Sequence, residues 1–139
     1  LLKEIDAPPA VLYYRGADLH TFSKNIAIIG SRKAGQYAER VIEAFVPPLI
    51  QSGWHVVSGG AIGADTMAHT YTVACGGRTV AILGSGLLCP YPTSNKKLFE
   101  LIVERDGAVV SPFALRQTAY PGNFPARNRI IAGMSQACL

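Results

Sequence analysis

The feature that most constrains the fold of this chain is a regular alternation of short apolar runs with longer amphipathic segments. The short runs are rich in β-forming residues and predict buried strands at residues 25–29, 54–57, 79–83 and 108–110. The segments that follow them predict helices at residues 34–50, 64–75, 95–105 and 126–134. A last apolar run, residues 137–139, is expected to begin another strand. This alternation is typical of an α/β domain in which helices cover both faces of a parallel sheet.

Right-handed crossovers make a doubly wound sheet the expected arrangement of these strands. We predict three layers (αβα), with the four strands in the spatial order 3-2-1-4. In that order a crevice opens at the carboxyl edge between the first and fourth strands, where open α/β sheets bind their ligands. Residues 1–24 are predicted to be a lead-in to a core formed by residues 25–139, all within one domain.

The first predicted helix contains two adjacent prolines, Pro47 and Pro48. Because proline removes a backbone hydrogen bond and clashes with the preceding turn, a kink or a break is expected near Val46. Helical periodicity places a set of apolar side chains on one face of this helix, namely Tyr37, Val41, Ala44 and Phe45.

The turn after the second strand is built almost entirely from small residues. Ser58, Gly59, Gly60 and Gly63 leave little side chain between the backbone and a ligand. The helix that begins at Ala64 points its free N–H groups and the positive end of its dipole toward this turn. A strand, turn and helix of this kind suit a phosphate group. A sharp connection that needs no ligand explains the same residues equally well.

Two basic elements fall near the same edge of the predicted sheet. Arg32 follows the first strand in the turn Gly30-Ser31-Arg32, where a guanidinium can hold a phosphate through two hydrogen bonds. Arg127, Asn128 and Arg129 lie in the first turn of the last helix, where the dipole disfavours cations and an anion would compensate. The alternatives are a solvated turn arginine in the first case and internal pairing with Asp65 in the second.

Further candidates lie at the same edge. Lys96 and Lys97 begin the third helix and either contact phosphate or form a solvated face. Loops at this edge contain aromatic residues, which can stack on unpaired bases but more often anchor loops; they are Tyr91, Phe113, Tyr120 and Phe124. Asp65 and His69 are four residues apart on one helix, and we expect them to hold the turn in place rather than to catalyse.

Composition restricts the class of protein and its partners. With 49% hydrophobic and 16% charged residues, the 139-residue chain is that of a globular domain, and no apolar run is long enough to span a bilayer. A net charge of +4 makes an anionic partner plausible. The three cysteines and three histidines have no disulfide-framework or metal-ligand spacing. We therefore expect a cytoplasmic protein without a membrane, metal or cofactor partner.

Several known catalytic signatures are missing from the chain. There is no GxxxxGK[ST] motif, and Gly84-Ser85-Gly86 lacks the third glycine of a dinucleotide-binding turn. Ser94 and Lys97 fit S-x-x-K without its companion motifs. No nucleophile and base occupy positions that the strand ends would favour, so we do not expect an enzyme.

Four motifs in sequence order resemble those of the DNA-processing protein A family (DprA, also called Smf). The family's Gly-[Thr/Ser]-Arg appears as Gly30-Ser31-Arg32, and its Ser-Gly-x-Ala-x-Gly-Ile-Asp and Ala-His appear within residues 58–69. Its Gly-x-Gly, Tyr-Pro, Asn and Leu appear within residues 84–98, and its Phe-Pro-x-Arg-Asn-Arg-Ile-Ile-Ala-Gly matches residues 124–133. The chain departs from the family at Pro112, where glutamate is common, and at Ala64, where isoleucine is usual.

The resemblance implies a Rossmann-like domain that binds single-stranded DNA without hydrolysing it. It also implies protection of incoming DNA, loading of the RecA recombinase during natural transformation, and a homodimer. Because the family's domain continues with further strands, the chain is expected to be its first part. Motif matching and position together give the predicted DNA- or phosphate-binding residues, which are Gly30, Ser31, Arg32, Ser58, Gly59, Gly60, Gly63, Gly84, Gly86, Lys96, Lys97, Phe124, Arg127, Asn128 and Arg129. Asp65 and His69 are the predicted structural support.

Two other functions fit part of the sequence. The turn at residues 59–63 is also similar to that of phosphoribohydrolases of the lysine-decarboxylase-like (LOG) family, although their Pro-Gly-Gly-x-Gly-Thr-x-Glu-Glu motif does not occur here. A small-nucleotide sensor that binds without turnover is the third possibility.

Overall fold

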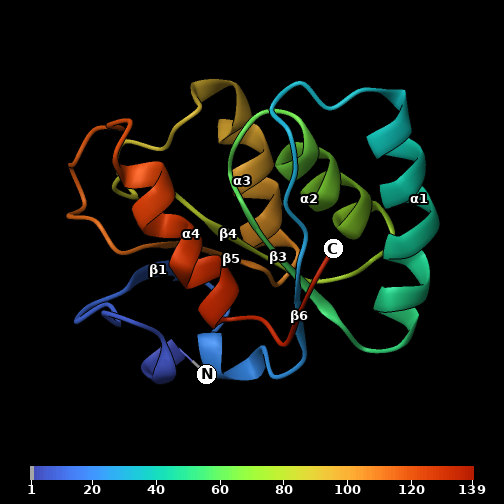
Figure 1. Ribbon diagram of the computed structural model, residues 1–139, viewed down its shortest axis with the longest axis horizontal. Helices are drawn as coiled ribbons and strands as arrows, with labels where there is room; N and C mark the ends of the chain where they lie inside the picture. The colour runs from blue at the N-terminus through green and yellow to red at the C-terminus, as the bar shows by residue number, and fades with distance from the viewer. Residues whose placement is uncertain (1) are drawn as a thin grey trace.

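The structure is a computed structural model that describes residues 2–139. Within these residues six strands form one sheet, and the strands are β1 (Tyr13–Gly16), β2 (Asn25–Ala27), β3 (His55–Gly59), β4 (Thr79–Ile82), β5 (Ala108–Ser111) and β6 (Ala137–Cys138). The helices are α1 (Gln36–Gln51), α2 (Ala64–Ala74), α3 (Lys96–Glu104) and α4 (Asn123–Gly133), with short 3-10 turns at Leu2–Glu4, Leu19–Thr21 and Thr93–Asn95. The predicted α/β class is therefore confirmed (Figure 1).

The order of the strands differs from the prediction. It is β1-β5-β4-β3-β2-β6, so the fourth predicted strand, β5, lies beside β4 and not beside β2. The parallel strands β2 to β5 advance in one direction, and the chain reverses only after β5, when α4 carries it back to place β6 beside β2. The strands carry similar apolar sequences, and their periodicity does not show after which of them the chain reverses. The reversal point between β2 and β6 takes the place of the predicted crevice between the first and fourth strands.

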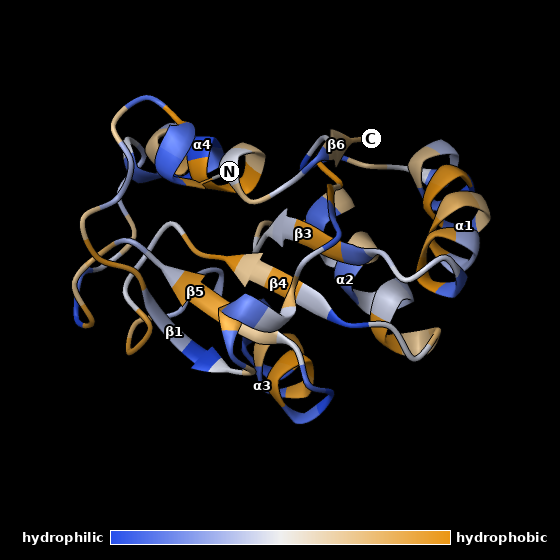
Figure 2. Ribbon diagram, turned by 90° about the horizontal axis from the view of Figure 1, so that it is seen from below, coloured by the Kyte–Doolittle hydropathy of each residue, from blue (hydrophilic) through white to orange (hydrophobic). Residues whose placement is uncertain are grey.

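Three αβα layers are present as predicted. Figure 2 shows α4 on one face of the sheet and α2 and α3 on the other. Successive strand residues face opposite layers, because the side chains of a strand alternate. Val57, Val80 and Val110 pack in the cluster on the α4 side, whereas the neighbouring Val56 and Val109 pack toward the helices of the other face.

The break expected at the prolines of α1 is absent, and the face that this helix buries differs from the predicted one. The helix continues through Pro47 and Pro48 without a break. The carbonyl groups that lose their hydrogen bonds belong to Glu43 and Ala44, and both residues are exposed, so water can satisfy them. The buried face contains Ile42 and Val46, while the predicted face is turned outward, with Tyr37 83% and Phe45 51% exposed.

Part of the lead-in belongs to the sheet. Strand β1 pairs antiparallel with β5, from Tyr13 opposite Ser111 to Gly16 opposite Ala108. Gly16 has a φ of 109°, and its backbone lies against Gly107, an approach that a side chain would block. At the other edge, the Asn25 side chain donates hydrogen bonds to the carbonyls of Phe22 (2.9 Å) and Met134 (2.8 Å), which fixes the segment that leads into β6.

Candidate functional site

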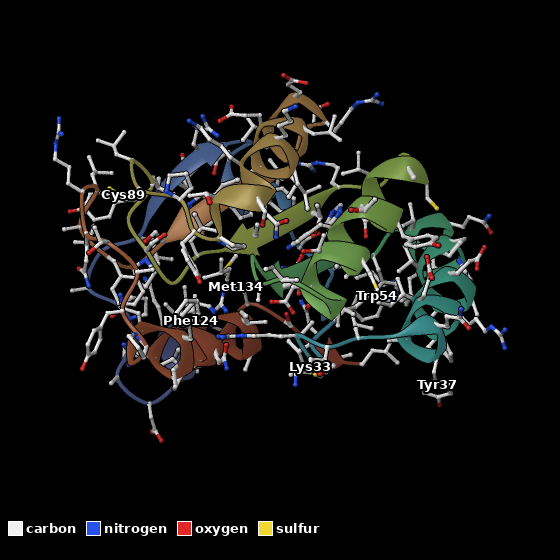
Figure 3. All side chains as sticks on the ribbon, turned by 90° about the horizontal axis from the view of Figure 1, so that it is seen from above. Lys33, Tyr37, Trp54, Cys89, Phe124 and Met134 are labelled. Carbon is white, nitrogen blue, oxygen red and sulfur yellow. The ribbon has the colours of Figure 1, made fainter. Side chains whose placement is uncertain are left out.

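The carboxyl ends of β2, β3, β4 and β5 bring four loops to one edge of the sheet, and Figure 3 looks onto this edge. These loops, residues 28–35, 60–63, 83–92 and 112–122, contain Arg32, Lys33 and Arg116 but no aspartate or glutamate. Their positive charge is therefore not balanced within the loops. We call this surface the basic edge.

The loop after β2 packs directly on the turn before α2. The Ala64 N–H donates to the Ser31 carbonyl at 3.1 Å, and the Ser58 hydroxyl donates to the Ile28 carbonyl at 2.5 Å. Gly63 has a φ of 91°, and a side chain there would collide with the backbone of Ser31 and Arg32. Two of the predicted motifs thus meet, and they hold Arg32 at the start of α2.

Most of the predicted binding glycines serve packing. Ser58 and Gly59 belong to β3 rather than to a loop, because they pair with Ala81 and Ile82 of β4. A side chain at Gly60 would meet the Phe99 ring at 2.7 Å, and one at Gly86 would meet the Ala114 and Leu115 backbone. These buried glycines let segments approach closely, whereas Gly30 and Ser31 are exposed and Gly63 is partly exposed.

Asp65 and His69 support the turn through hydrogen bonds. The Ala61 N–H donates to Asp65 Oδ2 at 3.3 Å. His69 is fully buried, and its Nε2 lies 2.6 Å from the Gly59 carbonyl, which can only accept, so this nitrogen carries the proton. The pKa of His69 is lowered, mainly because burial disfavours the charged ring. These contacts support the structural role expected for the pair.

The aromatic ring of Phe124 connects the two arginine motifs. The Arg32 guanidinium lies 4.9 Å from the centre of this ring, and the Arg127 guanidinium lies 5.8 Å from it. Tyr91 meets the same ring edge-on at 6.0 Å. A side chain at Gly84 would lie 2.9 Å from the ring, so the absence of a side chain at Gly84 allows this stack to form. In Figure 3, Phe124 lies at the start of α4 on the basic edge.

The two arginines have different surroundings. Arg32 is exposed, and among residues 2–139 it has no carboxylate partner. Arg127 is only 4% exposed, and its Nη1 donates to the Ile82 carbonyl. Its pKa is lowered chiefly by burial and also by the charge of Arg32, whereas the charge of Asp65 raises it. Gly59 makes room for this arrangement, because a side chain there would collide with both Asp65 and Arg127.

The structure does not bring every predicted residue to the Arg32 stack. Arg129 lies two positions beyond Arg127, about 200° around the helix, and donates to the carbonyls of Ala126 (3.0 Å) and Ala7. Asn128 lines a separate pocket of about 290 Å³ beside β6. Lys96 and Lys97 are exposed at the start of α3, as expected from the sequence.

The sequence analysis did not single out Lys33 and Arg116. They could have been found from the absence of acidic residues in all four loops that follow the strands. Among residues 2–139, no group of three His, Cys, Asp or Glu side chains could hold a metal ion. None of the helices that the structure describes is both long and apolar enough to cross a membrane.

The fold and the site define a class: a Rossmann-like α/β domain whose carboxyl edge is basic and presents an arginine stacked on an aromatic ring. Comparison with known families is more specific, because the profile of the family described as DNA recombination-mediator protein A matches residues 1–139. The chain belongs to this family, the DprA/Smf family.

Several relatives support this assignment. Protein Smf of Synechocystis is 42% identical over the whole chain, and DNA processing protein DprA of Streptococcus pneumoniae is 37% identical over 99% of it. The chain spans 36% and 48% of these two relatives, respectively. The X-ray structure of the S. pneumoniae protein matches 99% of the chain with a TM-score of 0.88 and 36% identity, and the chain covers 48% of it.

A second solved structure is that of DNA processing protein A from Helicobacter pylori. It is 28% identical to this chain and matches it with a TM-score of 0.88. The match covers 99% of this chain and 62% of the H. pylori chain. It is described as giving insight into the single-stranded DNA binding mode of that protein.

Proposed function

We propose that this domain binds single-stranded DNA at the basic edge and does not cleave it. The observation that carries the proposal is the exposed Arg32 guanidinium stacked 4.9 Å from the Phe124 ring, without a carboxylate partner among residues 2–139. A free guanidinium can hold a phosphate through two hydrogen bonds, and its flat face can stack on a base. The H. pylori relative, described as a single-stranded DNA binder, supports this choice of ligand.

The residues around Arg32 have separate tasks in this proposal. Arg32 and the exposed backbone of Gly30 and Ser31 contact phosphates, and Phe124 supplies the aromatic surface for an unpaired base. Arg127, whose guanidinium lies 5.8 Å from the centre of the Phe124 ring, acts as a positioning residue. Lys33 and Arg116 add positive potential that attracts the strand to the edge.

The wider role follows from the family. We propose that the whole protein acts in the cytoplasm, where it protects incoming single strands during natural transformation, delivers them to RecA and works as a homodimer. Curated relatives with the name DNA processing protein DprA support the family assignment on which this role depends. Their chains are about twice as long as this one or longer, so the dimer and the RecA contact belong to the whole protein.

Salt-dependent binding tests the proposal. Fluorescence anisotropy with a labelled oligo(dT) strand, measured over a range of salt concentrations, gives the number of phosphates that are neutralised. Replacing Arg32 by glutamine should weaken binding and lower the slope of log affinity against log salt by about 0.7. Arg40→Gln is the matched control, because Arg40 is exposed on α1. Equal slopes and affinities for Arg32→Gln and wild type would overturn the proposal.

A further inference from the structure

A pocket of about 340 Å³ lies on the basic edge beside the Phe124 stack. Its walls are the loop of residues 88–93, the side chain of Lys96 at the start of α3, and residues 118 and 119. Tyr91 belongs both to this wall and to the stack, because its ring lies 6.0 Å from the Phe124 ring. The pocket and the stack are therefore neighbours that share one aromatic side chain.

Backbone hydrogen bonds hold the walls of the pocket in place. The Gly86 N–H donates to the Gln117 carbonyl at 2.8 Å, and the Leu88 N–H donates to the Leu115 carbonyl at 2.9 Å. The Tyr91 N–H donates to the Ser85 hydroxyl at 3.2 Å. The first two bonds join the loop after β4 to the loop after β5, and the third braces the loop after β4, so the pocket is formed without a ligand.

The charge at the pocket favours an anion. Lys96 is exposed, and within the described residues 2–139 its ammonium group has no carboxylate partner. The surrounding segments, residues 83–95 and 112–122, contain Arg116 but no acidic residue. An aromatic wall with a free cation beside it matches a nucleotide, whose base can stack while its phosphate meets the cation.

We propose that this pocket is a second nucleotide subsite, in which a base stacks on Tyr91 and the adjoining phosphate contacts the Lys96 ammonium group. The subsite rests on the proposed function, because the strand reaches it from Arg32 and Phe124. Its base and phosphate would contact Tyr91 and Lys96, to which the first subsite assigns no DNA contact, although the Tyr91 ring packs against Phe124.

The angle between the two aromatic rings selects the kind of strand. The planes of Tyr91 and Phe124 are inclined by 64°. Bases that stack on these two rings cannot lie parallel to each other as they do in a duplex. A strand that fills both subsites must therefore be unpaired and locally unstacked, which gives the edge a geometric preference for single strands.

A series of oligo(dT) lengths tests the second subsite. For the shortest strand that the wild-type protein still binds, Tyr91→Leu should have the wild-type affinity. Once the strand is long enough to reach the pocket, Tyr91→Leu should bind it about 5-fold to 150-fold more weakly than wild type. Tyr91→Phe should keep the affinity because it keeps the ring. Lys96→Gln should lower the salt slope by about 0.7 for the longer strands only.

Matched controls separate this effect from general damage. Tyr37→Leu removes a tyrosine that is 83% exposed on α1, and Arg105→Gln removes a cation at the opposite end of α3 from Lys96. Urea unfolding confirms that each variant is folded. If Arg32→Gln loses affinity while the Tyr91→Leu and Lys96→Gln variants match wild type at every length, the subsite is refuted and the proposed function stands. If Arg32→Gln also matches wild type, the proposed function itself fails.

Discussion

Replacing Arg127 by methionine should separate a positioning role from direct contact with DNA. The Arg127 side chain is 4% exposed, and its guanidinium donates to the Ile82 carbonyl while it lies near the Asp65 charge. Methionine keeps much of the volume but leaves that carbonyl without a donor, which costs about 1–3 kcal/mol. Loss of the neighbouring positive charge also leaves the Asp65 carboxylate less stabilised. We therefore expect the free energy of unfolding to fall by about 2–4 kcal/mol.

Two measurements on the same variant test this prediction. Urea unfolding gives the free energy, and the salt dependence of oligo(dT) binding gives the number of phosphates contacted. Arg127→Met should weaken binding through a displaced Phe124 ring and leave the salt slope unchanged. Arg129→Met is the control, because Arg129 is exposed and should cost less than about 1 kcal/mol. A variant with wild-type stability and a reduced salt slope would show that Arg127 contacts phosphate directly, which would refute the reasoning.

Two more predictions concern the residues that hold the site. Gly84→Ala places a methyl group 2.9 Å from the Phe124 ring and should lower DNA affinity about 5-fold or more. Gly35→Ala is the control, because its methyl group meets no atom within 4 Å, and it should leave DNA affinity unchanged. Equal affinities for the two variants would contradict the role of the stack. The buried His69 has a pKa below its ordinary 6.5, so the unfolded chain takes up a proton that the folded chain refuses, and stability is lost as the pH falls below about 6.5. Urea unfolding between pH 7.5 and 5.5 should show a slope of the free energy of unfolding against pH that approaches about 1.4 kcal/mol per pH unit. This slope should be flatter in His69→Gln. An equal slope in both proteins would refute the prediction.

The sequence predicted the core elements of the fold but not their order. Buried strands leave a clear signal because apolar residues follow one another without a polar break, as they do from Val80 to Leu83. The reversal after β5 depends on contacts between distant segments, such as the Asn25 side chain with the Met134 carbonyl. The prediction of the apolar face of α1 was wrong for a related reason. Its apolar residues surround much of the helix, and packing against α2 selects Ile42 and Val46.

The candidate site was predicted in part. The carboxyl edge and the proximity of Arg32 to the last helix followed from the position of each turn after a strand. The difference between Arg127 and Arg129 could not be predicted in this way, because both are arginines in one motif. Only the packing of α4 buries Arg127 and exposes Arg129. Glycines were also ambiguous. A glycine that admits a ligand and one that admits a neighbouring ring, as Gly84 admits Phe124, look alike in a sequence.

The most direct test of the central claim is a crystal structure of the protein with a short oligo(dT) strand. It should place a phosphate within hydrogen-bonding distance of the Arg32 guanidinium and an unpaired base against the Arg32 and Phe124 surface on the basic edge. A strand bound on another face, with Arg32 still free, would contradict the account.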